Sequence, residues 1–350
     1  MDRGASTLGT LGTLNTLGTS KLVLMSKTYS WGILAPGNIA GKFVAELKGL
    51  DNARILAVGS RDLNRAREFA DIHGIPRSYG SYEELVSDPD IDIIYIASPH
   101  VFHAEQTKLC LRHHKAVLCE KAFGMNSEEV REMIDTAHME QTFLMEAFFT
   151  PHQPSYREAR QLIESGQVGE ILHIHGWFGF NKSPYDPKGR LFNPALGGSA
   201  ILDIGLYPLF DVLWFMGEPS ELNAFADLSP DNIDQTITVN LQYEGGKSAS
   251  IFASFLSATG VGTDIYCEKG MLRLRRTGAL NQSLEILLPG ESVRILNWDE
   301  TSCGLKLEAS ETMKCLCENQ LESPVMSHQC SIQLMKFLDL IREKIGTIKP

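Results

Sequence analysis

The first half of the chain alternates short apolar runs with polar segments of helical length. The apolar runs are 31–34, 55–58, 91–97, 116–119 and 143–145. Continuous apolar runs of this length are typical of parallel strands that are covered on both faces. The segments expected to form helices are 38–47, 63–73, 81–87, 103–112 and 127–140. Strand and helix in alternation predict a doubly wound α/β domain with a parallel sheet.

After Pro151 the pattern becomes that of a mixed domain. Residues 156–164 predict a helix, 171–180 a strand and 199–215 an apolar helix, with a loop rich in Pro, Gly and Asn at 181–198. Further strand-like runs are 236–243, 249–256, 263–267, 271–275, 284–288 and 293–296. Turn residues separate these runs, as in antiparallel sheets, and a periodic helix at 331–345 closes the chain. We therefore expect an α+β domain with an open, mainly antiparallel sheet.

Composition and charge exclude several classes of function. The formal net charge is −11, which argues against general binding to nucleic acid and against docking on an anionic membrane. No run of about 18 apolar residues occurs, so a membrane span is not expected. The seven cysteines are scattered and show no CxxC spacing. This distribution favours reduced thiols in a cytoplasmic protein, without a metal site.

The first predicted strand runs directly into a possible phosphate-binding loop, Ala35-Pro36-Gly37-Asn38-Ile39-Ala40. A tight turn from a strand into a helix presents free backbone N–H groups, which together with the helix dipole favour a pyrophosphate. Ala35 stands where the usual G-x-G-x-x-G/A fingerprint has its first glycine, so the loop alone is equally consistent with an ordinary turn. The surrounding strand–helix–strand pattern favours a dinucleotide site. Ala35, Gly37, Asn38 and Ile39 are the expected cofactor contacts.

The end of the second strand indicates which dinucleotide binds. An NAD enzyme usually carries Asp or Glu there to bind the ribose 2′-hydroxyl. This chain has Gly59-Ser60-Arg61 instead. A guanidinium and a hydroxyl suit a 2′-phosphate, so we predict NADP rather than NAD, bound by Ser60 and Arg61. The alternative is that Arg61 is a solvated surface residue beside Asp62.

These patterns divide the chain into an expected NADP-binding Rossmann domain at 27–148 and a substrate-binding and dimerisation domain at 149–350, whose last helix can pack back on the first domain. Residues 1–26 differ from both domains. Positions 7–19 repeat Thr-Leu-Gly with one change, and they lack the basic start and continuous apolar stretch of a signal peptide. We interpret 1–26 as a disordered, low-complexity extension.

Candidate catalytic residues occur at two places. Lys121 follows the strand predicted at 116–119, and ligands of open α/β sheets bind beyond the carboxyl ends of the strands. Asp203 and Tyr207 are four residues apart in an apolar helix, so they share a face. A buried carboxylate needs a partner such as a lysine or a substrate hydroxyl. The alternatives are a surface or capping role for Lys121 and a core role for Tyr207.

Several stretches of the chain match one known pattern. They are WGILAPGNIA, SRDLNRAREFA, YGSYEELVSDPDIDIIYIASPH, AVLCEKAFGMN, FLMEAFFT and GGSAILDIGLY. With Lys121, Asp203 and Tyr207 in the expected order, the chain resembles the Gfo/Idh/MocA oxidoreductases. The likeness is greatest to the branch of dimeric dihydrodiol and xylose dehydrogenases. The resemblance implies a homodimer or larger homo-oligomer formed through the open sheet.

The resemblance also implies roles for individual residues. Lys121 corresponds to the catalytic lysine and Tyr207 to the general acid/base, while Asp203 orients the substrate or the lysine. The residues expected near the cofactor are Pro99, His100, His103, Glu120 and Lys121. Those expected near the substrate are Glu146, Arg190, Phe192 and Asp203.

Two departures from the family pattern affect this interpretation. The family's Glu-Lys-Pro is here Glu120-Lys121-Ala122, and a cis peptide that proline permits is costly before alanine. We therefore expect the backbone at Lys121 to differ. Related sequences often carry Trp-Thr-Arg where this chain has Phe149-Thr150-Pro151, so a diverged substrate pocket is expected.

Together these features predict an NADP-dependent dehydrogenase. Its expected substrate is a secondary alcohol or hemiacetal of a sugar, a cyclic polyol or a dihydrodiol. Two alternatives stay open at this point. One is a catalytically silent NAD(P)-binding sensor or regulatory protein, and the other is a redox-neutral enzyme with retained NAD.

Overall fold

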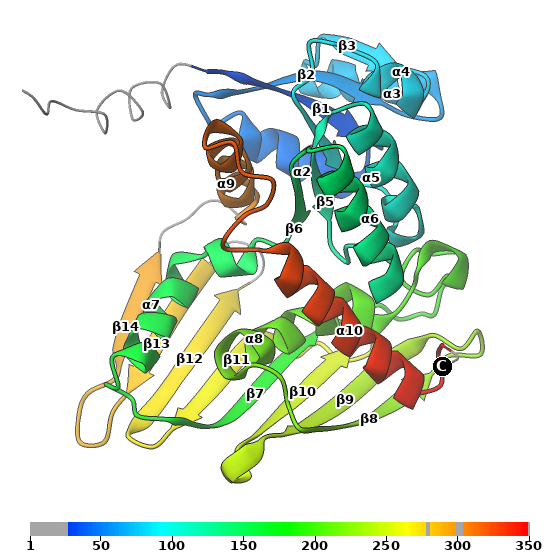
Figure 1. The fold of residues 1–350 in the computed structure, drawn as a ribbon. Coiled ribbons are helices and arrows are strands. Elements are labelled where there is room, and N and C mark those ends of the chain that lie inside the picture. The colour runs from blue at the N-terminus through cyan, green and yellow to red at the C-terminus, as the bar shows by residue number, and fades with distance from the viewer. Residues whose placement is uncertain (1–26, 278–280, 299–303, 349–350) are drawn as a thin grey trace, which may run out of the picture.

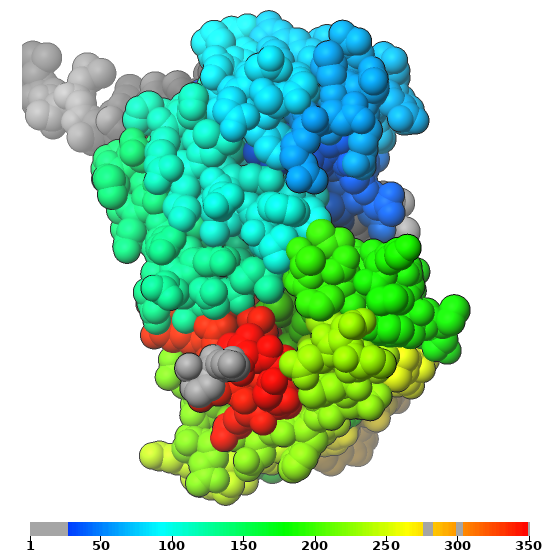
Figure 2. Space-filling model, turned by 90° about the vertical axis from the view of Figure 1, so that its right-hand side faces the viewer, coloured from blue at the N-terminus to red at the C-terminus, as the bar shows by residue number. Residues whose placement is uncertain are grey.

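The computed structural model describes residues 27–277, 281–298 and 304–348, so the expected extension at 1–26 and the thiol of Cys303 lie outside the described part. Two lobes are stacked on one another (Figure 1). The first part of the chain forms one lobe, the middle part forms the other, and the C-terminal helix lies where the two meet (Figure 2). Within the described residues all cysteines are free.

The first lobe is a parallel sheet of six strands in the order β3-β2-β1-β4-β5-β6. Its strands are β1 (Tyr29–Leu34), β2 (Ala53–Gly59), β3 (Arg77–Tyr79), β4 (Ile93–Ile96), β5 (Ala116–Glu120) and β6 (Leu144–Ala147). Its helices are α2 (Asn38–Leu47), α3 (Leu63–His73), α4 (Tyr82–Val86), α5 (His103–Arg112) and α6 (Ser127–Met139). The predicted doubly wound fold is confirmed. The prediction missed β3, a half-buried strand of three residues without an apolar run.

Local sequence explains where these elements begin. Every residue of β1, β4 and β5 is buried, as expected of strands covered on both faces. Ser81 caps α4 by accepting a hydrogen bond from the Glu84 N–H. Asn126 accepts from the Glu129 N–H at the start of α6, and the Glu129 carboxylate accepts in return from the Met125 N–H. Each of these two helices therefore begins at a polar side chain that binds the N–H group three residues further along the chain.

The second lobe is a sheet of eight strands in the order β14-β13-β12-β11-β7-β10-β9-β8. The strands are β7 (Ile171–Gly179), β8 (Glu221–Leu228), β9 (Asp234–Gln242), β10 (Ser248–Ser254), β11 (Gly260–Cys267), β12 (Gly270–Thr277), β13 (Asn281–Leu287) and β14 (Arg294–Trp298). Only β7 and β10 pair in parallel, so the predicted mainly antiparallel sheet is confirmed. The prediction missed β8, an edge strand in which alternate residues are exposed.

Helices cover one face of this second sheet (Figure 1). They include α7 (Pro154–Glu164) and α8 (Leu206–Met216), which continues a π-helical segment at Ile201–Gly205. The stretch Pro194–Met216 is long and apolar enough to cross a membrane by length and composition, but 78% of its apolar window is buried inside the protein. It is the core helix of the second lobe.

Two C-terminal helices pack against the first lobe. The prediction missed α9 (Leu305–Cys317), although Gly304 before apolar residues at helical spacing could have indicated it. This helix packs beside α2, and the Lys306 N–H donates to the Glu46 carboxylate. In α10 (His328–Lys344), the Asp339 carboxylate accepts from the Ser127 N–H at 2.8 Å, which joins the helix to the start of α6.

Candidate active site

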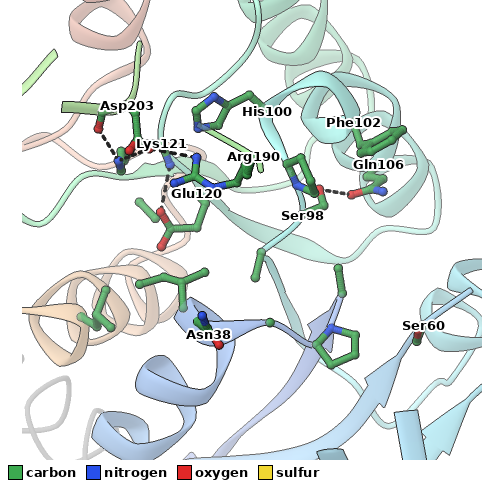
Figure 3. A pocket seen from close by; sticks show the side chains of 18 of the residues that line it. Asn38, Ser60, Ser98, His100, Phe102, Gln106, Glu120, Lys121, Arg190 and Asp203 are labelled. Atoms are coloured by element: carbon green, nitrogen blue, oxygen red, sulfur yellow. Dashed lines mark hydrogen bonds and ion pairs between the residues drawn. The ribbon is translucent and has the colours of Figure 1, made fainter. Parts of the chain in front are cut away.

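A cavity of about 900 Å³ lies between the two lobes. Residues that follow β1, β2, β4 and β5 line it from the first lobe, as expected for a ligand site at the carboxyl ends of parallel strands. Side chains of both lobes converge at one end of it (Figure 3). The lining contains these predicted site residues: Ala35, Gly37, Asn38, Ile39, Ser60, Arg61, Pro99, His100, Glu120, Lys121, Arg190, Asp203 and Tyr207.

The loop predicted to bind phosphate, at 35–40, has an unusual backbone angle at its first residue. Ala35 has φ 72°, in the left-handed region that glycine normally occupies. Gly37 is the N-cap of α2, and a methyl group at its Cα would meet no atom within 4 Å. The N-terminus of α2 is therefore open to the cavity, and its free N–H groups can hold a phosphate. Alanine at position 35 keeps the loop geometry at the cost of strain.

A basic group of side chains lines the far end of this loop. Ser60 follows β2, and the Arg61 guanidinium lies 5.3 Å from the centre of the Phe102 ring. Arg65, in the first turn of α3, lines the same end, and Tyr82 lies beside the two arginines. Sequence analysis did not single out Arg65 or Tyr82. The spacing of four residues between Arg61 and Arg65 at the start of a predicted helix was the available signal for Arg65.

The catalytic candidates meet at the opposite end of the cavity, 82 residues apart in the chain. The Lys121 ammonium donates to the backbone oxygen of Asp203 at 2.7 Å and lies 3.5 Å from its carboxylate Oδ1. Arg190 also binds this Oδ1, at 3.0 Å. The Lys121 Nζ lies 5.0 Å from the centre of the Tyr207 ring. The structure thus brings Lys121, Asp203 and Arg190 together (Figure 3). Tyr207 joins this cluster through its ring, which lies beside the Lys121 ammonium.

The backbone at Lys121 differs from the expectation raised by Ala122. The Lys121–Ala122 peptide bond is cis although no proline follows the lysine. The expectation of a different backbone at this position is therefore wrong.

Charge in the cluster is strongly coupled. Burial raises the pKa of Asp203, but Lys121 and Arg190 outweigh it and hold this pKa well below its usual range. Burial lowers the pKa of Lys121, whereas Tyr207, Asp203 and Glu120 raise it, and the net shift is upward. Asp203 is therefore an anion and Lys121 a cation at neutral pH. This is the arrangement that a buried ion pair needs in order to stay charged.

Glu120 is the last residue of β5 and directly precedes Lys121. Its side chain accepts a hydrogen bond from the buried Tyr95 hydroxyl and another, at 3.2 Å, from the Lys121 N–H. Burial raises the pKa of Glu120, and the Tyr95 hydrogen bond and the Lys121 charge oppose that rise. These contacts fix the carboxylate at the end of β5, directly beside the cavity.

His100 lines the same end and lies beside Pro99. Burial lowers its pKa to about 3, so the imidazole is neutral at physiological pH. Its Nδ1 is buried and has no hydrogen-bond partner among the described residues. This nitrogen is therefore available to a ligand or a water molecule in the cavity.

Three predicted site residues lie outside the cavity lining. His103 is buried, and each of its ring nitrogens lies 2.8 Å from a backbone carbonyl oxygen, one of Ser98 and one of Ala122. It therefore connects two loops behind the residues that line the cavity. Glu146 is 2% exposed, and burial raises its pKa to about 7. Phe192 is 1% exposed and packs against Tyr185 and Phe255. All three act on the site, if at all, through neighbouring residues.

An aromatic wall lies next to the charged cluster. Phe149, Phe178 and Phe180 line the cavity together with Tyr207, and the Phe149 and Phe178 rings each lie 5.7 Å from the Tyr207 ring. The described residues contain no group of three or more His, Cys, Asp or Glu side chains placed to hold a metal ion.

Comparison with protein families divides the chain into two matched parts. Residues 30–148 match the model of an oxidoreductase family with an NAD-binding Rossmann fold. Residues 156–273 match the model of the GFO/IDH/MocA C-terminal domain. The boundary between the two matches falls where the parallel sheet ends and the second lobe begins.

Curated relatives cover most of the chain. A trans-1,2-dihydrobenzene-1,2-diol dehydrogenase of Xenopus laevis is 35% identical over 332 residues, which are 91% of this chain and 99% of the relative. The enzyme of the same name from Homo sapiens is 35% identical, over 91% of this chain and 98% of its own length.

Solved structures show the same fold at lower identity. A 3-ketoreductase from Actinomadura kijaniata, in complex with TDP-benzene and NADP, has a TM-score of 0.79 at 21% identity and covers 91% of this chain and 98% of its own. An aldose-aldose oxidoreductase from Caulobacter crescentus has a TM-score of 0.81 at 20% identity, with the same two coverages.

Proposed function

Because the chain belongs to the Gfo/Idh/MocA family of NAD(P)-dependent oxidoreductases, we propose that it is an NADP-dependent dehydrogenase of secondary alcohols or hemiacetals. Its proposed substrates are sugars, cyclic polyols or dihydrodiols. The observation that carries the proposal is one cavity with an open helix N-terminus and two arginines at one end and the Lys121–Asp203–Tyr207 cluster at the other.

The residues at the nucleotide end fit NADP. The N-terminus of α2 can hold a pyrophosphate through its free N–H groups, with Gly37 leaving the approach open. Ser60, Arg61 and Arg65 line the position beyond β2 where a ribose 2′-phosphate would bind. Asp62 is the carboxylate in this stretch. It caps α3 instead, because its side chain accepts a hydrogen bond from the Asn64 N–H. Two guanidinium groups favour a phosphate over a hydroxyl.

The cluster at the other end provides the proton chemistry. When bound, the nicotinamide accepts or supplies the hydride of the reaction. Tyr207 takes the proton of the substrate hydroxyl during oxidation and returns it during reduction. The Lys121 ammonium stabilises the negative charge that develops on the substrate oxygen. Asp203 keeps Lys121 in place and keeps it charged, because both its backbone oxygen and its carboxylate contact the ammonium.

The aromatic wall supports a ring-shaped substrate. Phe149, Phe178 and Phe180 present apolar surface beside the charged cluster, so an apolar ring face packs on one side while its hydroxyl groups meet Lys121 and Arg190. The relatives named as dihydrobenzenediol dehydrogenases support a cyclic diol. The Actinomadura ketoreductase complex supports NADP as the cofactor.

The outer face of the second sheet is the proposed contact between subunits. A methyl group at Gly176 would meet Pro208 of α8, so the alternate side chains His173, His175 and Trp177 point to the opposite face. These side chains are half-buried within one chain, and Tyr266 beside His173 is 40% exposed. An open sheet face with aromatic side chains suits a contact between two copies of the chain. We therefore propose a homodimer, and we propose that the enzyme is cytoplasmic.

The test of the proposed function is a substrate screen with NADP⁺ and NAD⁺, using trans-1,2-dihydrobenzene-1,2-diol, pentoses and cyclic polyols. We expect NADPH formation with at least one of these alcohols. Lys121→Ala and Tyr207→Phe should each lower kcat by about 10³-fold or more while NADP⁺ affinity stays within about threefold. Lys108→Ala, which removes a surface ion pair with Glu132, is the matched control. Near-normal turnover in both active-site variants would refute the proposal.

A further inference from the structure

We propose that Asp234 is a positioning residue for the catalytic cluster, acting through the first turn of the helix that carries Asp203 and Tyr207. The inference rests on the proposed dehydrogenase function. Asp234 is the first residue of β9 and does not line the cavity. It is 1% exposed and belongs to neither the cofactor site nor the substrate site described above.

The contact between Asp234 and the helix is direct. Asp234 Oδ2 accepts a hydrogen bond of 2.6 Å from the Ile201 N–H, at the start of the π-helical segment. Ser199 completes this cap, because its hydroxyl accepts from the Leu202 N–H at 3.2 Å and also hydrogen-bonds to Asp234. A carboxylate that holds free N–H groups at a helix start both satisfies them and complements the helix dipole. Asp234 therefore caps this helix from another strand.

The turn that Asp234 caps is the turn that holds Lys121. Asp203 lies two residues beyond Ile201, and its N–H donates to the Ser199 carbonyl. The Asp203 carbonyl oxygen accepts from the Lys121 ammonium at 2.7 Å, and π-helical geometry is frequent at functional sites. A shift of this turn therefore moves the acceptor of Lys121 and the Asp203 carboxylate together. Catalytic groups lose much of their effect when displaced by about 1 Å.

Packing leaves this turn little other freedom. A methyl group at Gly205 would lie 2.6 Å from Ile201 Cδ1 and 3.2 Å from the Ala253 side chain, so the far end of the segment rests closely on β10. With that end fixed by packing, the capped end is set by its hydrogen bonds. Asp234 supplies the only cap from outside the helix that the described hydrogen bonds contain for this turn.

The charge of Asp234 depends on a small set of neighbours. Burial raises its pKa to about 6, against the hydrogen bonds from Ser199 and Ile201 and the positive charge of Arg342 on α10. Arg342 is itself held by the Met125 carbonyl and lies 3.7 Å from Asp339. The register partner of Asp234 on β8 is Leu228, which carries no charge. Asp234 thus loses its charge within the range where an enzyme can be assayed.

The experiment compares Asp234→Asn with wild type, using NADP⁺ and the alcohol of highest kcat/KM from the screen. We expect kcat at pH 8 to fall about 10- to 30-fold, with KM and NADP⁺ affinity within about twofold. The wild-type to variant ratio of kcat should shrink as pH is lowered from 8 to 5, because protonated Asp234 and the asparagine that replaces it are both neutral. A purely structural role would lower kcat by the same factor at every pH.

A second readout does not need turnover. Lys121 in the cofactor-free protein is labelled with trinitrobenzenesulfonate and quantified by mass spectrometry. We expect labelling to be several-fold faster in Asp234→Asn, because Lys121 loses a fixed acceptor. If no screened alcohol is oxidised but this rate still rises, the dehydrogenase proposal fails while the positioning role stands. Unchanged labelling and unchanged kcat would overturn the positioning role.

Asp227→Asn, the same change on the exposed side of β8, is the matched control and should equal wild type. If Asp234→Asn does not fold, Ser199→Ala replaces it. That variant removes one hydroxyl from the same cap and should lower kcat about two- to fivefold in the same direction. A wild-type kcat in a folded Ser199→Ala protein would then count against the proposal.

Discussion

The two ends of the cavity are built in opposite ways. The nucleotide end comes from one lobe, mainly from two short stretches, the loop after β1 and the residues from Ser60 to Arg65, with Tyr82 and Phe102 beside them. The catalytic end is assembled from both lobes, and Lys121 and Asp203 meet across 82 residues of chain. At the nucleotide end each contact depends on local backbone. At the catalytic end each charge depends on a distant partner, so one substitution there changes several groups at once.

Burial separates the two ends further. Arg61 and Arg65 are exposed, whereas Asp203 is 7% exposed and is held charged by Lys121 and Arg190. Removing one member of a buried ion pair leaves the other uncompensated, which costs far more than removing an exposed charge. We therefore expect changes at the catalytic end to be larger and less local than changes at the nucleotide end.

The largest effect should come from Asp203→Asn, which removes the carboxylate at the centre of the catalytic end. Lys121 loses its counter-ion and Arg190 its acceptor, so we expect kcat/KM to fall about 10³-fold, roughly 4 kcal/mol. Affinity for NADP⁺ should stay within about threefold, as measured by titrating nicotinamide fluorescence. Asp186→Asn, on the exposed part of the loop at 181–198, is the control. An equal loss of NADP⁺ affinity would show that the two ends are not separable.

The next largest effect is expected at the nucleotide end. Arg61→Ala with Arg65→Ala removes two charge-assisted contacts to a 2′-phosphate, each worth about 1.5–3 kcal/mol, so NADP⁺ affinity should fall at least 100-fold. NAD⁺ affinity should change less than about threefold. Arg67→Ala, exposed on the same helix, serves as the comparison in isothermal titration. If NAD⁺ binding fell as far as NADP⁺ binding, the arginines would be holding the common part of the nucleotide.

Folding stability should depend on pH through Glu146, a buried carboxyl group behind the wall of the cavity. Burial raises the pKa of Glu146 from its ordinary value of 4.5 to about 7, so the folded state keeps a proton that the unfolded state releases. Stability therefore falls as pH rises from about 4.5 to 7. Glu146→Gln removes this dependence. The free energy of unfolding of the variant, relative to that of wild type, should therefore be ~2 kcal/mol larger at pH 8 than at pH 5.

Urea unfolding at the two pH values measures the gain, with Glu105→Gln on the exposed face of α5 as the control. A difference between variant and wild type that is the same at both pH values would contradict the assignment.

The smallest effect is expected from Ala35→Gly in the phosphate-binding loop. Ala35 is strained at φ 72°, and glycine removes the strain but adds entropy to the unfolded chain. These opposing terms leave a net stabilisation below about 1 kcal/mol, visible as a rise of a few degrees or less in Tm. NADP⁺ affinity should not change. A destabilised glycine variant would mean that the loop is held in this conformation without strain.

Local sequence was sufficient for much of the fold. The apolar runs of β1, β4 and β5 and the capping pairs at Ser81 and Asn126 specify elements through neighbours in the chain. Local sequence also places Ser60 and Arg61 directly after β2, where both line the cavity. The edge strand β8 and the short β3 were missed because exposed or very short strands leave weak patterns.

The sequence by itself determined the two kinds of sheet, the turn from β1 into α2 and the residue types of the Lys121–Asp203–Tyr207 cluster, because those depend on periodicity and on motifs within a few residues. Only the tertiary structure decided which of them meet. It placed Arg65 in the cavity, His103 and Glu146 behind its wall, and Asp234 under the helix that holds Asp203. Such contacts join residues distant in the chain, and the packing of two lobes, not local pattern, sets them.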